Sequence, residues 1–353
     1  MTEAKRRKMA EGAEGLTIGT HSGTFQCDEA LGVWMLRQLP KWKGAKLVRS
    51  RDNAVLDAIT ASGGIVIDVG GRYDPAELRF DHHQRGFFET FDGDPGKASN
   101  AGEATGAFKT KLSATGLVYK HFGEEVLRAL CPGLDGERLK AVFVKLYEGM
   151  VEGIDAIDNG IEIADETRYK EGTHLSARVA RLNPRWNAPS VDQAGEDALF
   201  EQASALAGQE FAEQLAGLTE SWLPARDEVE KALLARASVH SCEQILCFES
   251  GGMPWKEHLY ALEREHGITT LVKFVLYQDN SGMWRVQAVT AEGTAFTNRL
   301  GLPESWRGLR DAELCDKSGI ADCCFCHAAG FIGGNKTKAG ATAMALAAID
   351  GGS

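Results

Sequence analysis

The sequence contains no apolar run of the roughly 18 residues that a membrane-spanning helix requires. Residues 1–15 carry charges and no apolar segment follows them, so they do not resemble a secretory signal. The sequence also shows no internal repeat and no low-complexity tract. These absences argue against a membrane or secreted protein and predict an intracellular globular chain, whose 353 residues are enough for two domains.

Positive charge is scarce as well. The chain has 39 Lys and Arg residues against 50 Asp and Glu residues, which gives a net charge of −11. A protein that coats nucleic acid non-specifically needs a broad basic face, so that class is disfavoured. An acidic balance suits an enzyme that gathers carboxylates around divalent cations and binds phosphate only locally. A short basic run at residues 5–8 is compatible with a nuclear address.

Disulfide bonds are not expected, because eight cysteines in a chain without a secretory signal favour reduced thiols. Cys315, Cys323, Cys324, Cys326 and His327 lie close together in the sequence but do not form two separated ligand pairs. The segment 323–327 instead alternates in the way that is typical of a buried strand. A zinc site is therefore disfavoured.

The first half of the chain alternates strand and helix patterns. Strands are expected at residues 16–20, 45–48 and 65–69. Helical patterns cover residues 30–39, the stretch through Tyr119 that follows Ser113 as its N-cap, and residues 139–156. Strands that alternate with helices at this spacing predict a doubly wound α/β domain with a mainly parallel sheet.

The second half has a different pattern. Residues 192–234 are polar and helix-forming, with Pro224 as an interruption, and a hairpin signal at 279–282 separates strands expected at 268–277 and 284–290. Helical patterns at 255–266 and 336–349 complete a smaller α+β domain. The expected organisation is a flexible N-terminus (1–15), a metal-binding catalytic domain (16–190), a helical connector (191–240) and a substrate-binding domain (241–353), with the active site in the cleft between the domains.

Acidic and histidine side chains follow four apolar elements of the first half. The candidate metal ligands are His21, Asp28, Asp68, Asp81, His82, His83, Asp155 and Asp158. His21 and Asp28 are expected in the loop after the first strand, and Asp155 and Asp158 at the end of a helix. In an open α/β sheet, the carboxyl ends of the strands border one crevice, so these groups should converge there. Each alone is more often a cap or turn former; their coincidence favours a site for two divalent cations.

These segments resemble a known superfamily. His21-x6-Asp28, Ile67-Asp68-Val69-Gly70, Asp81-His82-His83-Gln84-Arg85 and residues 155–160 are similar to the four metal motifs of the DHH phosphoesterases. RecJ-type nucleases, nano-RNases and manganese pyrophosphatases belong to that superfamily. Further segments resemble its eukaryotic branch, the melanocyte-proliferating-gene (MYG) exonucleases; they are residues 20–25, 28–31, 176–184, 255–259, 306–310 and 327–334. The resemblance covers residues 16–350.

The resemblance implies hydrolysis of RNA from a single-stranded 3′ end with two Mn²⁺ ions, or with Mg²⁺ in their place. Asp68 would bridge the two metals, and His21, Asp28, His82, Asp155 and Asp158 would supply further metal contacts. Asp81 and His83 are the catalytic candidates, and His83 would contact the phosphate or protonate the leaving group. The family's association with nucleus and mitochondrion makes these the expected compartments, with the cytoplasm as the alternative.

Two positions depart from the family pattern, which usually has a histidine where this chain has Gln26 and another where it has Asn335. A glutamine carbonyl is a poorer ligand for Mn²⁺ than an imidazole, so one metal is expected to bind weakly or to be a different ion. Cys27 is the alternative ligand at the first position, although a small buried cysteine is the more common role.

A phosphate-binding turn is expected in the second domain. Gly333-Gly334-Asn335-Lys336 lies between an apolar strand and a helix, where glycines and a helix N-terminus favour an anion. The expected phosphate contacts are Arg85, Arg178, Arg181, Gly333, Gly334, Asn335, Lys336 and Lys338. The segment is not a P-loop, because the second required glycine is missing.

Three functions remain open from the sequence. The first is a metal-dependent 3′–5′ RNA exonuclease. The second is a DHH hydrolase of a small phosphate substrate such as pyrophosphate or a short oligonucleotide. The third is a catalytically weakened relative that serves as a binding module, for which Gln26 is the best support.

Overall fold

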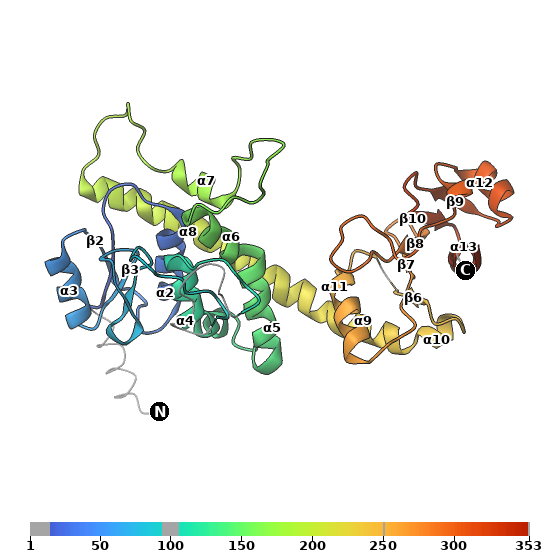
Figure 1. Cartoon of the computed structure of the whole chain (residues 1–353), viewed down its shortest axis with the longest axis horizontal. Helices are drawn as coiled ribbons and strands as arrows, with labels where there is room; N and C mark the ends of the chain where they lie inside the picture. The colour runs from blue at the N-terminus through green and yellow to red at the C-terminus, as the bar shows by residue number, and fades with distance from the viewer. Residues whose placement is uncertain (1–14, 94–105, 250, 352–353) are drawn as a thin grey trace. The chain divides into compact units, whose positions relative to one another are not determined.

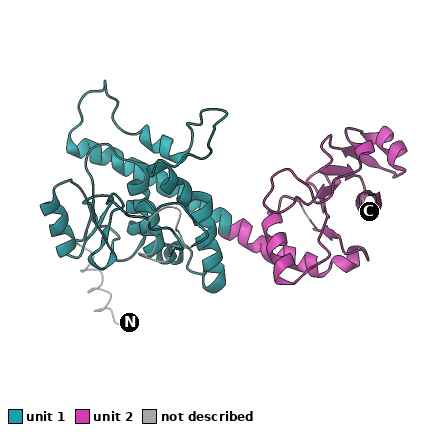
Figure 2. Ribbon diagram, in the orientation of Figure 1, with its two compact units in different colours: residues 1–218 teal, residues 219–353 magenta. Residues whose placement is uncertain are grey.

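The computed structural model describes residues 15–93, 106–249 and 251–351 (Figure 1). Residues 1–14, with the basic run expected as a nuclear address, lie outside the described residues. The chain divides into two compact units, residues 1–218 and 219–353, so the division falls within the expected connector (Figure 2). In the part of the chain that the structure describes, no helix is long and apolar enough to cross a membrane.

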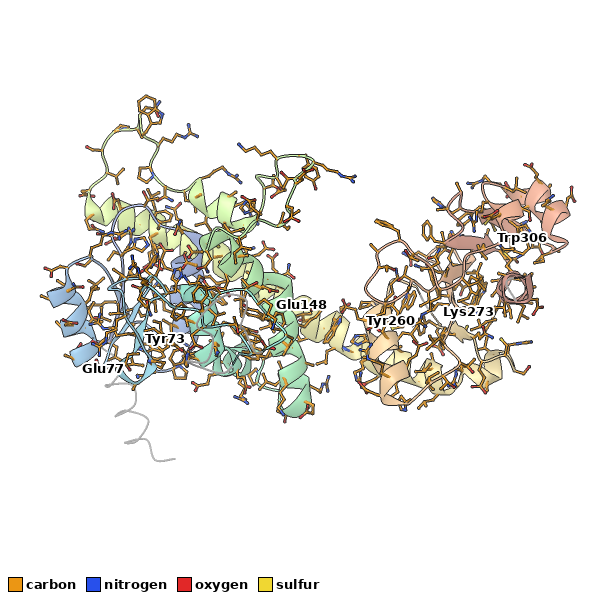
Figure 3. The ribbon with its side chains drawn as sticks, viewed as in Figure 1. Tyr73, Glu77, Glu148, Tyr260, Lys273 and Trp306 are labelled. Atoms are coloured by element: carbon orange, nitrogen blue, oxygen red, sulfur yellow. The ribbon has the colours of Figure 1, made fainter. Side chains whose placement is uncertain are left out.

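The first unit contains a five-stranded sheet with the strand order β2-β1-β3-β5-β4. Its strands are β1 (Thr17–Thr20), β2 (Lys46–Arg49), β3 (Ile65–Ile67), β4 (Tyr73–Asp74) and β5 (Arg79–Phe80). The pairs β1–β2, β1–β3 and β3–β5 are parallel, and β4 pairs antiparallel with β5. Tyr73 of β4 packs edge-on against the rings of Phe80 and Phe87 (Figure 3).

Helices cover both faces of this sheet. The helices of the unit are α2 (Cys27–Gln38), α3 (Asn53–Ala61), α4 (Ala114–Leu130), α5 (Gly136–Leu146), α6 (Glu152–Asp158), α7 (Leu175–Ala180) and α8 (Gln193–Gly217). Successive side chains of a strand point to opposite faces. Val66 of β3 faces Ile59 of α3, close to Gly19, whereas the next residue, Ile67, faces α2 at Gly32. The doubly wound, mainly parallel α/β fold is thus confirmed.

Strand β3 ends two residues earlier than the sequence pattern predicts. The apolar run continues to Val69, but Asp68 has a left-handed backbone with a φ of 58°. Non-glycine residues adopt this conformation rarely and at an energetic cost, and such residues cluster at functional sites. The turn ends the strand and places the Asp68 carboxylate at the carboxyl edge of the sheet.

The helical segment expected at 139–156 is not one continuous α-helix. It consists of α5, a π-helical turn (Tyr147–Val151) and α6. A second π-helical turn (Leu218–Trp222) lies between α8 and α9 (Leu223–Leu234), just before Pro224 in the first turn of α9. A proline ring clashes with the carbonyl group four residues earlier in an α-helix, and a wider turn relieves that clash. The expected interruption at Pro224 therefore takes the form of a π-turn.

The second unit has a mixed sheet with the order β6-β7-β8-β10-β9, in which β6–β7 is the parallel pair. Its elements are α9, α10 (Arg236–Val239), β6 (Ile245–Cys247), α11 (Lys256–Glu265), β7 (Phe274–Gln278), β8 (Trp284–Ala288), a 3₁₀ turn (Glu304–Trp306), α12 (Asp311–Ser318), β9 (Cys323–Cys326), β10 (Ile332–Asn335) and α13 (Lys338–Gly351). The α+β class, the β7–β8 hairpin and the cysteine-rich strand agree with the sequence patterns.

The glycine pair of the second unit corrects an expectation. Gly333 and Gly334 are part of strand β10 rather than a turn between strand and helix. A Cβ atom on Gly333 would come within 2.9 Å of Leu302 and Met344, and one on Gly334 within 2.5 Å of the Arg285 guanidinium. Packing of the strand against its neighbours therefore accounts for both glycines.

Candidate metal centre

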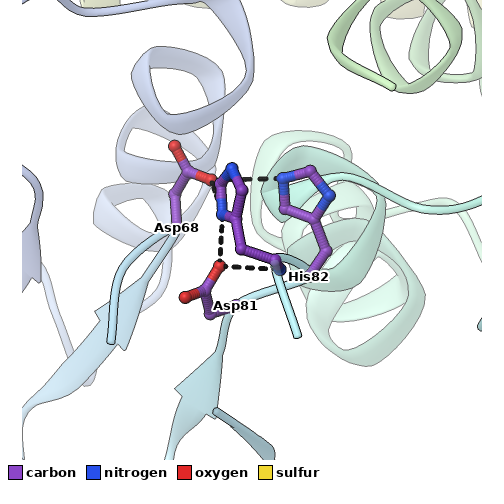
Figure 4. Close-up of side chains that lie close together, drawn as sticks. Asp68, Asp81 and His82 are labelled. Atoms are coloured by element: carbon purple, nitrogen blue, oxygen red, sulfur yellow. Dashed lines mark hydrogen bonds and ion pairs between the residues drawn. The ribbon is translucent and has the colours of Figure 1, made fainter. Parts of the chain in front are cut away.

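The carboxyl edge of the first sheet brings most of the expected ligands together. Asp68 follows β3, and Asp81 with His82 follows β5 (Figure 4). His21 follows β1. Among the described residues, three overlapping groups have ligand atoms within 4.8 Å of one another. The first group is Asp68, Asp81, His82 and His83, the second is His21, Glu29 and Asp68, and the third is Asp28, His82 and Asp158. Seven of the sequence-derived residues thus converge, five from the edge where parallel strands end and two, Asp28 and Asp158, from helices α2 and α6.

Asp68 lies at the centre of the cluster. Its Oδ2 atom is 3.3 Å from Nε2 of His21, whereas its Oδ1 atom is 3.4 Å from Nε2 of His82. The carboxylate is buried and presents its two oxygens to two different sets of ligands. This is the arrangement that a carboxylate needs to bridge two cations.

Asp28, His82 and Asp158 form the group on the α2 and α6 side. Nε2 of His82 lies 3.0 Å from Oδ2 of Asp158. Asp28 is the second residue of α2, and not part of the loop after β1 as the sequence suggested. In the first turn its carboxylate is favoured by the exposed N–H groups of the helix.

Several buried polar atoms in the cluster make no hydrogen bond of good geometry, although His82 lies within ion-pair distance of Asp68 and Asp158. Both oxygens of Asp28, Oδ1 of Asp68, Oδ2 of Asp158 and both ring nitrogens of His82 are buried without a well-aligned partner. Leaving such an atom unpaired costs about 1–3 kcal/mol, and buried polar groups are otherwise nearly always satisfied. A divalent cation would supply the missing partners. A set of carboxylates with imidazoles fits Mn²⁺, and its oxygens also suit Mg²⁺.

Without a cation, protons compensate for the gathered negative charge. Burial disfavours protonation of His21, but its contacts with Asp68 and Glu29 outweigh burial and raise its pKa to about 10. His82 has its pKa raised to about 9, because Asp158 and Asp68 outweigh burial. Burial together with the nearby Asp68, Asp158 and Glu29 raises the pKa of Asp28 well above its usual range. Metal binding should therefore release protons.

These shifts predict how the stability of the metal-free protein depends on pH. A histidine with a raised pKa stabilises the fold below its unfolded value of 6.5, and that stability is lost as the pH rises through its folded value. In EDTA, the free energy of unfolding should therefore fall between about pH 6.5 and pH 10. Urea denaturation of wild-type protein and of His21→Gln measures the effect. The variant should have a shallower pH slope, whereas His327→Gln in the second unit should keep the wild-type slope; equal slopes would contradict the expectation.

Asp155 is held apart from these groups. Its Oδ1 atom accepts hydrogen bonds from the Ser113 N–H (3.0 Å), the Ser113 hydroxyl (2.8 Å) and the Gly116 N–H (3.0 Å), and its Oδ2 atom accepts one from Tyr147 (3.0 Å). Ser113 is the N-cap residue of α4 as expected, but Asp155 provides the capping oxygen. Gly116 is needed here, since a Cβ atom at this position would overlap the Asp155 carboxylate. The geometry favours Asp158 over Asp155 as the metal ligand.

Substitutions should distinguish the structural role of Asp155 from the metal-binding role of Asp158. Asp155→Ala leaves buried donors unpaired and should lower the free energy of unfolding by about 2–4 kcal/mol, with Mn²⁺ affinity per folded molecule retained. Asp158→Asn should keep the stability but weaken Mn²⁺ binding at least about tenfold. Denaturant melts and calorimetric titration with Mn²⁺ measure the two quantities. The reverse assignment would appear as intact Mn²⁺ affinity in Asp158→Asn.

Asp81 positions His83. The Asp81 carboxylate accepts hydrogen bonds from the N–H groups of Gly71 (2.5 Å) and His83 (3.2 Å), and its Oδ1 atom is 2.7 Å from Nδ1 of His83. The His83 side chain is 60% exposed, unlike the buried His82. The contact with Asp81 is the main reason why the pKa of His83 is raised. An exposed imidazole fixed at Nδ1 can exchange a proton at Nε2.

Two residues near the cluster were missed from the sequence. Glu29 is fully buried, with Oε1 3.2 Å from Nε2 of His21. It also accepts hydrogen bonds from the Gln26 N–H, so its spacing suggests only a helix cap. Burial lowers the pKa of Lys111, whereas the negative charges of Asp158 and Asp81 act in the opposite direction, so this cation is within electrostatic reach of the cluster. Its Nζ atom lies 5.7 Å from the centre of the Phe87 ring. Lys111 lies between β5 and α4 in the sequence, where no motif indicates that it belongs to the site.

Gln26, which departs from the family pattern, and the next residue, Cys27, differ in their exposure to solvent. Gln26 is exposed at the N-cap of α2, whereas Cys27 is buried in the helix. Burial raises the pKa of the Cys27 thiol to about 12, so the thiol stays protonated at neutral pH unless a metal binds it. Cys27 belongs to none of the candidate metal groups found among the described residues, which disfavours it as a ligand.

The expected phosphate contacts are spread over both units. Arg85 is exposed near the cluster, Arg178 pairs with Glu210 at 3.0 Å, and Arg181 donates to the Gly172 carbonyl group. In the second unit, Lys336 lies 3.8 Å from Asp322 and Lys338 lies over the Trp284 ring.

Asn335 has a structural role in the second unit. It is buried, donates to the Ala321 carbonyl group and accepts from the Thr337 N–H and hydroxyl groups. Its polar atoms are thus occupied at the start of α13. The cysteines nearby belong to none of the candidate metal groups found in the described residues.

Known proteins resemble the chain over nearly its whole length. The family model MYG1_exonuc, described as an uncharacterised protein family (UPF0160), matches residues 17–349. The "MYG1 exonuclease" of Mus musculus is 48% identical over 336 residues, which are 94% of this chain and 84% of the mouse protein. The "MYG1 protein" of Dictyostelium discoideum is 44% identical over 338 residues, 95% of this chain and 97% of that protein.

A solved structure of RecJ with Mn²⁺ from Thermus thermophilus is 14% identical and covers 97% of this chain and 54% of RecJ. Its TM-score of 0.21 is too low to support a statement about this chain. The match to the family model, by contrast, extends over residues of both units and includes every expected site residue, and the two relatives match at least 94% of the chain. The chain therefore belongs to the MYG1 exonuclease family.

Proposed function

We propose that this protein is a metal-dependent phosphodiester hydrolase that removes nucleotides from the 3′ end of single-stranded RNA. The observation that carries the proposal is the buried Asp68 carboxylate, whose two oxygens face separate ligand sets with unpartnered atoms. The relatives named MYG1 exonuclease support a nuclease. RNA as substrate and the 3′–5′ direction come from the family resemblance of the sequence motifs.

Two divalent cations at this site would activate a water molecule and stabilise the leaving oxygen. Asp68 would contact both, with His21 on one side and Asp28, His82 and Asp158 on the other. Asp81 fixes His83 through Nδ1, so that Nε2 of His83 can donate a proton to the leaving oxygen. Lys111, within electrostatic reach of Asp158 and Asp81, would contact a phosphate oxygen.

Purified protein with Mn²⁺ and end-labelled single-stranded RNA tests the proposal. A 5′-labelled substrate should yield a ladder of progressively shorter products, whereas a 3′-labelled one should release a labelled mononucleotide at once. EDTA should abolish both, and Mg²⁺ and Mn²⁺ tested separately show which ion supports turnover. Release of phosphate from pyrophosphate alone would favour the small-substrate hydrolase, and absence of turnover with any of these substrates would favour a binding module.

A further inference from the structure

A cavity of about 230 Å³ adjoins the metal centre within the first unit. Asp28 and Asp158 are among the residues that line it, so the lining includes carboxylates of the candidate metal site. Its other walls come from α6 and the short helix α7, and include Ile157, Ala177, Ser176 and His174. The cavity is therefore continuous with the place where a scissile phosphate would bind.

The walls combine apolar surfaces with a few polar groups. Ile157 is 47% exposed, although isoleucine side chains are usually buried. It gives the cavity an apolar wall. Ala177 and Ala180 lie three residues apart on one face of α7, where their small side chains leave the space open. Nδ1 of His174 accepts a hydrogen bond from the Ala177 N–H, so the neutral ring carries its proton on Nε2 as a donor.

We propose that this cavity binds one nucleoside, the group attached to the scissile phosphate; this rests on the proposed hydrolysis of phosphodiesters. Both oxygens of Asp28, which lines the cavity, are buried without a hydrogen bond, so a cation held by Asp28 would bring the bound phosphate beside the cavity. The group next to the phosphate then occupies the cavity, where a base packs on Ile157 and the alanines, and Ser176 and His174 meet polar atoms of the nucleoside. A half-open space of about 230 Å³ accepts one nucleoside, which fits the release of mononucleotides.

Binding of a mononucleotide tests the proposal without any need for turnover. Titration calorimetry with Mn²⁺-loaded protein compares adenosine 5′-monophosphate with inorganic phosphate. Wild-type protein should bind the nucleotide at least about tenfold more tightly, since an apolar pocket rewards the base. Ala177→Leu fills the cavity and should remove that preference, with affinities for phosphate and Mn²⁺ unchanged. Ala198→Leu, at an exposed position of α8, should keep it.

A wild-type protein that binds the nucleotide no better than phosphate would overturn the proposal, as would a preference that survives in Ala177→Leu. Circular dichroism checks that the variant is folded, and Ala180→Leu provides a second filling variant on the same face of α7. Failure of the proposed hydrolysis is a separate result. It would appear as intact nucleotide preference in a protein that cleaves none of the RNA substrates.

Discussion

Asp68→Asn should reduce metal-dependent hydrolysis of RNA by about 10³-fold or more, because one carboxylate serves both ligand sets. The substitution keeps the size and shape of the side chain but removes the charge that would hold two cations. The left-handed backbone at this position also tolerates asparagine, so the turn after β3 should survive. Initial rates with end-labelled RNA measure the loss, and calorimetry measures the fall in Mn²⁺ affinity.

The matched control is Asp135→Asn. Asp135 is exposed at the N-cap of α5, makes no side-chain capping bond and lies outside the candidate metal groups, so the same chemical change should leave the rate unaltered. Retention of more than about a tenth of wild-type activity in Asp68→Asn would mean that Asp68 does not hold the reactive cation.

Asp28→Asn should have opposite effects on the stability of the metal-free protein and on that of the metal-bound protein. Both Asp28 oxygens are buried without partners beside Asp68, Asp158 and Glu29, and this environment raises the pKa of Asp28. A neutral amide removes the buried repulsion and can donate to a neighbouring carboxylate. The free energy of unfolding in EDTA should therefore rise by about 1–3 kcal/mol.

The same variant should lose the stabilisation that Mn²⁺ gives. A cation at 100 times its dissociation constant adds about 2.7 kcal/mol to the wild-type free energy of unfolding, and a weakened site forfeits most of that. Urea denaturation with EDTA and with saturating Mn²⁺ gives both values for each protein. If the variant is less stable than wild type in EDTA, Asp28 is not under electrostatic strain and the site is not built for a cation.

The sequence patterns predicted the sheet, and they predicted that several candidate ligands lie close together, because both features depend on local order. A buried parallel strand is a short β-branched run, and the residue after it must lie at the carboxyl edge of the sheet. His21, Asp68 and Asp81 could therefore be assigned to one crevice without coordinates. Glu29 could not, because its distance from His21 depends on how α2 packs on the sheet.

The same dependence on packing explains why the sequence did not reveal the roles of Asp155 and Asp158 or of the glycine pair at 333 and 334. Asp155 and Asp158 are three residues apart in the same helix, and nothing in their sequence shows that one reaches the N-terminus of α4 while the other reaches His82. The glycine pair at 333 and 334 resembles an anion-binding turn in the sequence. Its place inside β10 depends on packing with Leu302 and Arg285, which are distant along the chain, and with Met344 of α13.

The sequence by itself thus determined the α/β class and the acidic and histidine-rich composition of the candidate site, since each follows from residue order and hydrophobic period. The tertiary structure decided which oxygens make no hydrogen bond, that Asp155 caps a helix while Asp158 faces His82, and that a cavity of about 230 Å³ lies beside Asp158. Those features depend on distances between segments far apart in the chain, which packing sets and residue order does not.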